Sequence, residues 1–240
     1  MHTWRRLVDE AIRRQVDLVC LTGDIVDESN KYFEAFGPVM EGLRRLEERD
    51  ISTFLVAGNH DYDVLAELID QVDLPGVRLL GRNGMWEAVT FDHPERALTV
   101  AGWSFPARHY HRNPTADFPR SGPGEQLTVG LLHCDLDGVD SAYAPVSRTE
   151  LEETAVDCWL LGHLHKPALY TEAVPVLYTG SPHALDRGEQ GPHGPWLLTI
   201  HPSDRIETEH LPLSPVRYDA LAVDVSAVTT REDWRTSVVS

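Results

Sequence analysis

Apolar residues recur along the first part of the chain at two alternating spacings. Residues 3–14 and 32–46 place apolar side chains every three or four positions, which is the period of an amphipathic helix. Unbroken apolar runs at 18–21 and 54–57 favour buried strands instead, and a short helix is predicted over 65–69. This alternation of helix and strand predicts an α/β fold in which helices pack on a sheet.

The regular alternation of predicted helices and strands ends at residue 76. Further strands are predicted at 77–80, 86–91, 97–103, 127–132, 157–161, 176–179 and 196–200. A helix is predicted over 146–154, and the Pro-, Arg- and His-rich residues 103–124 predict a long loop. Prolines punctuate residues 202–215. We therefore predict one catalytic domain over 1–211 and, over 212–240, the truncated start of a C-terminal extension or cap domain.

Composition excludes several classes of protein. The chain has 240 residues, of which 42% are hydrophobic, so it can bury a sizeable core and is not disordered as a whole. No run approaches the roughly 20 apolar residues of a membrane span. The three cysteines lack paired spacing, and the opening residues form no apolar leader. Together these features indicate a cytoplasmic protein without a membrane partner.

Net charge bears on the choice of partner. The chain carries 21 Lys and Arg against 38 Asp and Glu, a formal net charge of −17. Because nucleic-acid binders usually present a basic surface, this charge alone argues against passive DNA binding. Bound divalent cations would attract phosphate themselves, so the objection loses most of its weight if a metal is present.

Four of the predicted strands end in side chains that bind metals. The runs are LVCLTGD, TFLVAGNH, LTVGLLH and WLLGHLH, which bring Asp24, Asn59, His133, His163 and His165. Each residue alone has an ordinary explanation as a turn or a hydrogen-bonded side chain. Because ligands gather beyond the carboxyl ends of strands in α/β sheets, their shared position predicts a single metal site. Oxygen and imidazole donors without thiolate suit Mn, Fe or Zn.

These motifs resemble the signature of the calcineurin-like metallophosphoesterase superfamily. Its order is matched by Gly23-Asp24-Ile25-Val26-Asp27, Gly58-Asn59-His60-Asp61, His133 and Gly162-His163-Leu164-His165. The tail motif Gly180-Ser181-Pro182, followed by Gly188-Glu189 and His193-Gly194, resembles more specifically the DNA-repair exonuclease branch related to the SbcD nuclease. The resemblance implies a four-layer α-β-β-α sandwich.

The resemblance also implies roles for individual residues. Two divalent metal ions are expected, Mn first and Fe or Zn as alternatives, with Asp24 bridging them. One metal would be completed by Asn59, His133 and His163, and the other would bind His165. The catalytic residue would be His60, acting on the phosphate. Asp61 would orient His60, and Asp27 would support the loop.

One element of the family pattern has no counterpart in this sequence. The pattern opens with a strand ending in Asp-x-His, whereas here the predicted helix 3–14 comes first. We therefore expect a sandwich that is missing its first strand, which a longer chain would supply. Without that strand, the second metal would keep only His165 and Asp24, and hydrolysis would be weak or absent.

The resemblance implies a metal-dependent phosphodiester hydrolase, a DNA exonuclease or endonuclease of repair, with DNA as substrate and an SMC-like ATPase as partner. The sequence leaves open whether the protein forms a homodimer.

Arg108 and Arg112, among aromatic residues, are candidate substrate contacts, although an ordinary loop packed on the sheet explains them equally well. Two alternatives remain. One is a phosphoesterase for a small nucleotide, lipid or phosphoprotein, and the other is a truncated scaffold that binds a metal or a partner without catalysis.

Overall fold

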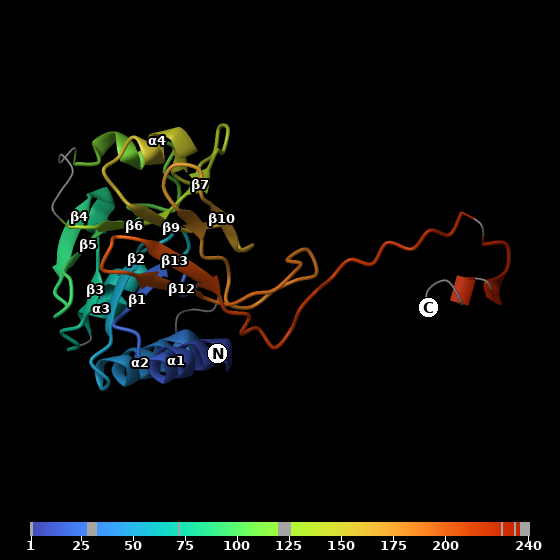
Figure 1. The fold of residues 1–240 in the computed structure, drawn as a ribbon, viewed down its shortest axis with the longest axis horizontal. Helices are drawn as coiled ribbons and strands as arrows, with labels where there is room; N and C mark the ends of the chain where they lie inside the picture. Colours follow the sequence, from blue (N-terminus) through green and yellow to red (C-terminus); the bar gives the residue numbers. More distant parts are fainter. Residues whose placement is uncertain are drawn as a thin grey trace.

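A computed structural model describes residues 2–27, 33–71, 73–119, 126–226, 228–232 and 234–235. Its architecture is two facing β-sheets with helices on the outer face of one and a helix with loops on the outer face of the other (Figure 1). This arrangement confirms the predicted α/β class and the four layers. No helix within the described ranges combines the length and apolar character needed to cross a membrane.

The first sheet is small and entirely parallel. Its order is β1 (Leu18–Thr22), β2 (Ser52–Val56) and β3 (Val77–Leu79). Thr22 is in register with Val56, so the carboxyl ends of β1 and β2 lie level with each other. The polar residues that follow these two strands therefore leave the sheet at the same edge.

The second sheet has six strands in the order β10-β11-β9-β6-β5-β4. These are β4 (Glu87–Phe91), β5 (Leu98–Trp103), β6 (Thr128–His133), β9 (Cys158–Gly162), β10 (Ala168–Tyr170) and β11 (Val176–Tyr178). The four central strands run parallel, and β4 and β10 pair antiparallel at the edges. His133 is in register with Gly162, so β6 and β9 also end at a common level.

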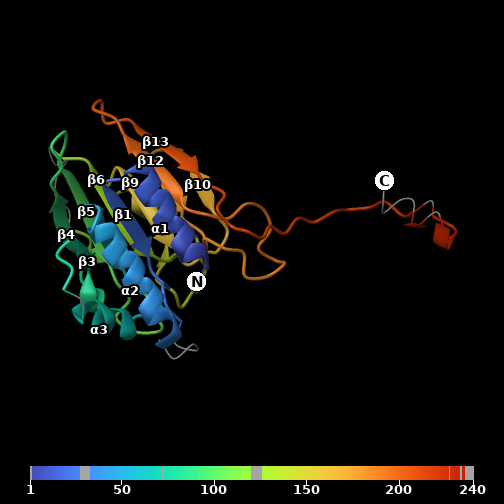
Figure 2. The ribbon, with the colours of Figure 1, turned by 90° about the horizontal axis from the view of Figure 1, so that it is seen from below.

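Successive side chains along each strand point to opposite faces of its sheet, so one set packs against the outer helices and the other packs between the two sheets. In β2, Leu55 packs toward α2 (Phe33–Glu47) and α3 (Val64–Asp70), while Phe54 and Val56 pack between the sheets. Figure 2 shows α1 (His2–Arg14) and α2 lying along the outer face of the first sheet. On the far side of the second sheet, Trp159 packs with Leu151 of α4 (Arg148–Glu152).

The structure contains short elements, β10 among them, that the sequence-based expectation did not include. Residues 206–210 form β13 (Ile206–His210), which pairs with β12 (Trp196–Ile200) as a separate hairpin inside the proline-punctuated stretch. The predicted loop 103–124 contains a 3₁₀ helix at Pro114–Asp117. A short pair, β7 (Asp135–Leu136) with β8 (Pro145–Val146), follows β6. Short strands and single helical turns carry too few periodic positions to be predicted.

Candidate active site

The carboxyl ends of four strands from the two sheets meet at one point. Nδ1 of His133, at the end of β6, donates to the carbonyl oxygen of Thr22, at the end of β1, over 2.9 Å. Glycine is required where the strands come this close. Gly23 has φ +89°, and a Cβ atom on Gly162 would lie 2.7 Å from Nδ1 of His133. The glycines before the polar residues therefore let the two sheets approach.

Three predicted ligands are brought together there. Nε2 of His133 lies 3.0 Å from Oδ1 of Asn59 and 3.2 Å from Oδ2 of Asp24. Neighbouring ligands of a cation bound at about 2.1 Å are themselves about 3 Å apart, so this spacing fits a shared divalent cation. The side chains of His133 and Asn59 are buried, which fixes their positions.

Charge at this point favours an ionised carboxylate. Burial alone would raise the pKa of Asp24, but the hydrogen bond and charge of His133, with the backbone N–H of His60, outweigh burial and lower it. Burial also opposes protonation of His133, yet the hydrogen bond that this imidazole donates to Asp24 raises its pKa overall. Both ring nitrogens of His133 face oxygen atoms. The position between Nε2 and the oxygens of Asn59 and Asp24 can be occupied either by a second proton on the ring or by a metal ion.

His163 lies next to this cluster. Its ring centroid is 5.3 Å from that of His133 and 5.0 Å from that of Tyr143. Burial and the charge of His133 lower the pKa of His163 to about 4, so the imidazole is neutral at pH 7 and has a lone pair for a metal. The backbone of His163 has φ +98°, a strained conformation for a residue with a side chain, as often found at functional sites.

His60 and its two neighbouring aspartates differ from expectation. Nδ1 of His60 lies 3.1 Å from Oδ2 of Asp27, so Asp27 is the carboxylate that orients His60. Asp61 is fully buried and accepts backbone N–H groups from Gly58 and Ile25, each at 2.7 Å. The expected roles are therefore reversed. Asp61 directly follows His60 in the chain, so its side chain points away toward the loops that it holds together.

His165 does not join the cluster as expected. Its side chain is 49% exposed, and Nδ1 lies 2.6 Å from Oε1 of Glu189. The other carboxylate oxygen of Glu189 accepts the backbone N–H of Leu185 at 2.8 Å. Within the described part of the chain, no three His, Cys, Asp or Glu side chains are grouped to hold a metal. The third donor beside Asp24 and His133 is the amide oxygen of Asn59. The residues present fit one cation better than two.

Glu189 is a site residue that sequence reasoning did not single out. It lies in the tail motif Gly188-Glu189, which was used only as a resemblance to the exonuclease branch. Ser181 of the same motif donates to Glu189 over 3.4 Å, and its hydroxyl lies 3.2 Å from Nδ1 of the buried His193. The tail motif therefore supports His165. The position of Glu189 within this motif is the sequence signal that could have identified it as a site residue.

The aromatic side chains of the candidate substrate loop, in its described residues 103–119, pack in or against the core. Trp103 and Phe105 are each only 1% exposed, and Phe118 packs on Trp86 with ring centroids 4.7 Å apart. These aromatic side chains are not available to stack on bases, which favours the alternative of a loop packed on the sheet. Arg112 is exposed and faces Asp117 at 3.9 Å. The assignment of Arg108 and Arg112 to substrate binding stays a prediction.

Comparison with known proteins agrees with this geometry. Residues 1–167 match the family model described as calcineurin-like phosphoesterase, which includes all the strand-end motifs. The chain belongs to the calcineurin-like phosphoesterase family. This family membership accounts for the order in which the strand-end motifs occur along the chain.

Two relatives extend the comparison. The chain is 30% identical over 226 residues to the uncharacterized metallophosphoesterase YhaO of Bacillus subtilis, covering 92% of this chain and 54% of that protein. It is 22% identical over 262 residues to the DNA double-strand break repair protein Mre11 of Methanopyrus kandleri, covering 99% of this chain and 57% of that protein. The chain thus spans about half the length of both relatives.

A solved structure shares the fold. The protein TT1561 of Thermus thermophilus superposes with a TM-score of 0.53 at 13% identity, covering 87% of this chain and 92% of that chain. At this identity the likeness concerns the fold alone.

Proposed function

We propose that this chain is a metal-dependent phosphodiester hydrolase that acts on DNA as a repair-type nuclease. The observation that carries the proposal is the meeting of His133 Nε2 with the side-chain oxygens of Asn59 and Asp24 at the strand ends of two sheets. Membership of the calcineurin-like phosphoesterase family supports the reaction class. Similarity to Mre11, a DNA repair protein, supports DNA as substrate.

Asp24, Asn59 and His133 would hold a divalent cation, with His163 beside them. Mn²⁺ is our first choice, and Fe²⁺ or Zn²⁺ suit the same donors. When bound, the cation supplies positive charge and Lewis acidity to the phosphate. Glu189 holds His165 apart from these donors, so His165 would not be a ligand of this cation.

The residues of the chain itself would orient the phosphodiester and move a proton. The backbone N–H of His60 donates to Oδ1 of Asp24 over 2.9 Å, which ties the His60 loop to the metal-binding carboxylate. The imidazole is 40% exposed, and Asp27 engages its Nδ1 atom. Nε2 is left for substrate, where it can stabilise the phosphate or protonate the leaving oxygen.

The test compares substrates in Mn²⁺ and in EDTA. We expect cleavage of single-stranded DNA in Mn²⁺, none in EDTA, and a strong loss with His60→Ala. Faster release of phosphate from mononucleotides than cleavage of DNA would favour the small-substrate alternative. Mn²⁺ binding without hydrolysis of either substrate would favour the non-catalytic scaffold.

The resemblance to the exonuclease branch also leads us to propose an SMC-like ATPase as partner. Co-purification of the two proteins from cells that express both is the direct test. We expect a complex that survives size-exclusion chromatography, and separate elution of the two proteins would contradict this part of the proposal.

A further inference from the structure

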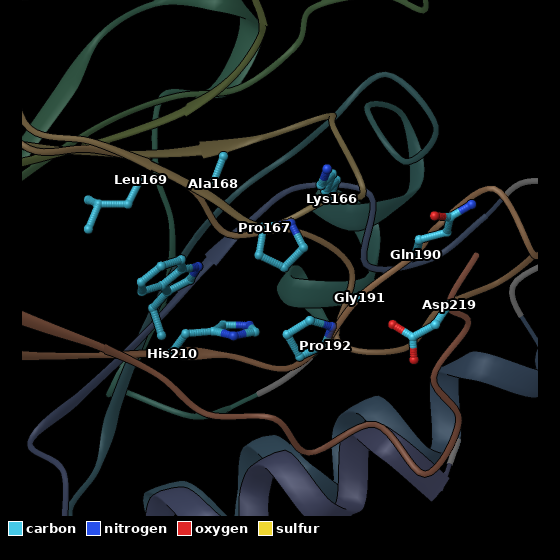
Figure 3. A pocket seen from close by; sticks show the side chains of 10 residues that line it. Lys166, Pro167, Ala168, Leu169, Gln190, Gly191, Pro192, His210 and Asp219 are labelled. Atoms are coloured by element: carbon cyan, nitrogen blue, oxygen red, sulfur yellow. The ribbon is translucent and has the colours of Figure 1, made fainter. Parts of the chain in front are cut away.

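A pocket of about 440 Å³ lies between the start of β10 and the β12–β13 hairpin, and Lys166, the residue that follows His165 in the chain, lines it (Figure 3). Its wall includes Lys166, Leu169, Gln190, Trp196, His210 and Asp219. Sites for small molecules commonly have volumes of about 300–1,000 Å³, so the pocket is large enough for one.

The pocket and the candidate active site share two segments of chain. Lys166 directly follows His165, and Gln190 directly follows Glu189. The contact between His165 and Glu189 joins these segments at 2.6 Å. A phosphate beside His165 would therefore have the pocket next to it, and a group attached to that phosphate could enter it.

One wall of the pocket is aromatic. Trp196 of β12 and His210 of β13 are directly opposite each other, with ring centroids 4.9 Å apart. Nε2 of His210 lies 3.2 Å from the carbonyl oxygen of Gly194, which fixes the imidazole. The indole Nε1 of Trp196 is buried and has no hydrogen-bond partner among the described residues.

The opposite side of the pocket is polar. Figure 3 shows the side chains of Gln190 and Asp219 across from Leu169 and His210. The backbone N–H of Gly191 donates to the carbonyl oxygen of Tyr218 over 2.9 Å, which holds Asp219 beside Gln190. An amide and a carboxylate offer both donors and acceptors to the edge of a flat ring.

Lys166 supplies a positive charge at the same pocket, and no ion pair to its ammonium is found in the described part of the chain. A nucleotide matches this combination, because it carries a flat ring, a polar ring edge and an anionic phosphate. Aromatic stacking and amide contacts are common means of base recognition.

We propose that this pocket binds the base of a nucleotide whose phosphate is held beside His165. The inference rests on the proposed phosphoesterase function, since it makes the pocket a base subsite of the same active centre. The base can come from a free nucleotide or from the end of a DNA strand.

The experiment measures equilibrium binding to the whole chain in EDTA, by calorimetry and tryptophan fluorescence. The probes are dAMP, ribose 5-phosphate and a pentanucleotide of deoxyadenosine. We expect dAMP to bind at least about tenfold more tightly than ribose 5-phosphate, which has no base. We expect Lys166→Met combined with Gln190→Ala to weaken dAMP binding by about tenfold, with Gln71→Ala, an exposed glutamine at the end of α3, as the unaffected control.

Trp196→Phe keeps an aromatic ring in the wall and should abolish the fluorescence change on adding dAMP while the remaining tryptophans still report folding. Tighter binding of the pentanucleotide than of dAMP would assign the base to a DNA end, and the reverse would assign it to a free nucleotide. Both results support a base subsite.

Equal binding of dAMP and ribose 5-phosphate would overturn the inference, as would a double variant that binds dAMP like the wild type. This outcome is separable from failure of the proposed function. Binding is measured without metal and without cleavage, so it can succeed in a chain that proves inactive. Hydrolysis of bis(p-nitrophenyl) phosphate by a chain that shows no preference for dAMP would refute the base subsite alone.

Discussion

Nδ1 of His60 lies 3.1 Å from Oδ2 of Asp27, and this contact aims the imidazole from the loop after β2. We expect His60→Ala to lower kcat by a factor of about 10²–10⁴, because a group that transfers a proton is lost. Asp27→Asn should lower kcat by about 10-fold or more without weakening Mn²⁺ binding, because it acts through His60. The measurement is hydrolysis of bis(p-nitrophenyl) phosphate in Mn²⁺.

Asp63→Asn is the matched control for Asp27→Asn. Asp63 lies in the same loop as His60, is exposed, and makes no side-chain cap hydrogen bond to α3. If Asp27→Asn retained the kcat of the Asp63→Asn control, the positioning role of Asp27 would be wrong.

Asp61 should matter for stability. Its buried carboxylate accepts N–H groups from Gly58 and Ile25, so Asp61→Ala leaves one buried and one partly buried donor unpaired in the loops after β2 and β1. We expect a loss of about 3 kcal/mol in the free energy of unfolding. Urea denaturation in EDTA measures it, and a loss below about 1 kcal/mol would show that these loops do not depend on Asp61.

Asp61 should also make stability depend on pH. Burial and the charge of Asp24 raise the pKa of Asp61 from 3.8 to about 6 despite its backbone hydrogen bonds. The folded state then binds the proton more tightly than the unfolded state, so this contribution to stability falls as pH rises from about 4 to 6. Asp61→Asn removes the titration. In EDTA, we expect the unfolding free energy of the wild type to decline relative to that of the Asn variant across this range, whereas parallel curves would contradict the shift.

Binding of Mn²⁺ to the cluster of Asp24, Asn59 and His133 should stabilise the folded protein. At 100 times its Kd, a cation that binds only the folded state adds about 2.7 kcal/mol, which raises Tm by about 5–10 °C in a chain of this size. Asn59→Ala and His133→Ala should lose this increment because they remove ligands. His165→Ala should keep most of it, since His165 lies with Glu189. His2→Ala, at the exposed start of α1, is the control. An increment that survives His133→Ala would mean that Mn²⁺ binds elsewhere.

Arg108 and Arg112 can contribute charge to DNA binding but not base stacking, because Trp103 and Phe105 beside them are buried. If both arginines contact phosphates, replacing them with Ala should reduce the salt slope of single-stranded DNA binding by about 1.4. An unchanged slope would remove the two arginines from the substrate site. Arg78→Ala, on β3 and exposed, is the comparison variant.

The strand-end donors could be predicted because a local pattern encodes them. An apolar run that ends in Gly-Asp, Gly-Asn-His or Gly-His-x-His fixes both the strand and the position of its polar end. The meeting of His133 with Asp24 and Asn59 follows from parallel strands that end level in two facing sheets. The four layers, in contrast, are expected from the family resemblance and not from this pattern.

Side-chain partners could not be predicted in the same way. Whether His60 turns to Asp27, 33 positions earlier in the chain, or to the adjacent Asp61 depends on loop dihedral angles that no local sequence pattern reveals. Glu189 reaches His165 from 24 positions away in the chain. The hairpin strand β13 alternates exposed and half-buried residues, IETEH, and lacks the apolar run that revealed the other strands. The expected Asp-x-His strand and the boundary at 211 stay predictions.

The most direct test of the central claim is the rate at which this chain hydrolyses bis(p-nitrophenyl) phosphate as Mn²⁺ is titrated into metal-free protein. The cluster of Asp24, Asn59 and His133 should give a rate that saturates with Mn²⁺, vanishes in EDTA, and drops by at least about 100-fold in Asn59→Ala and His60→Ala. A rate that is independent of Mn²⁺, or one that is undiminished in both variants, would contradict a metal-dependent phosphoesterase site at these strand ends.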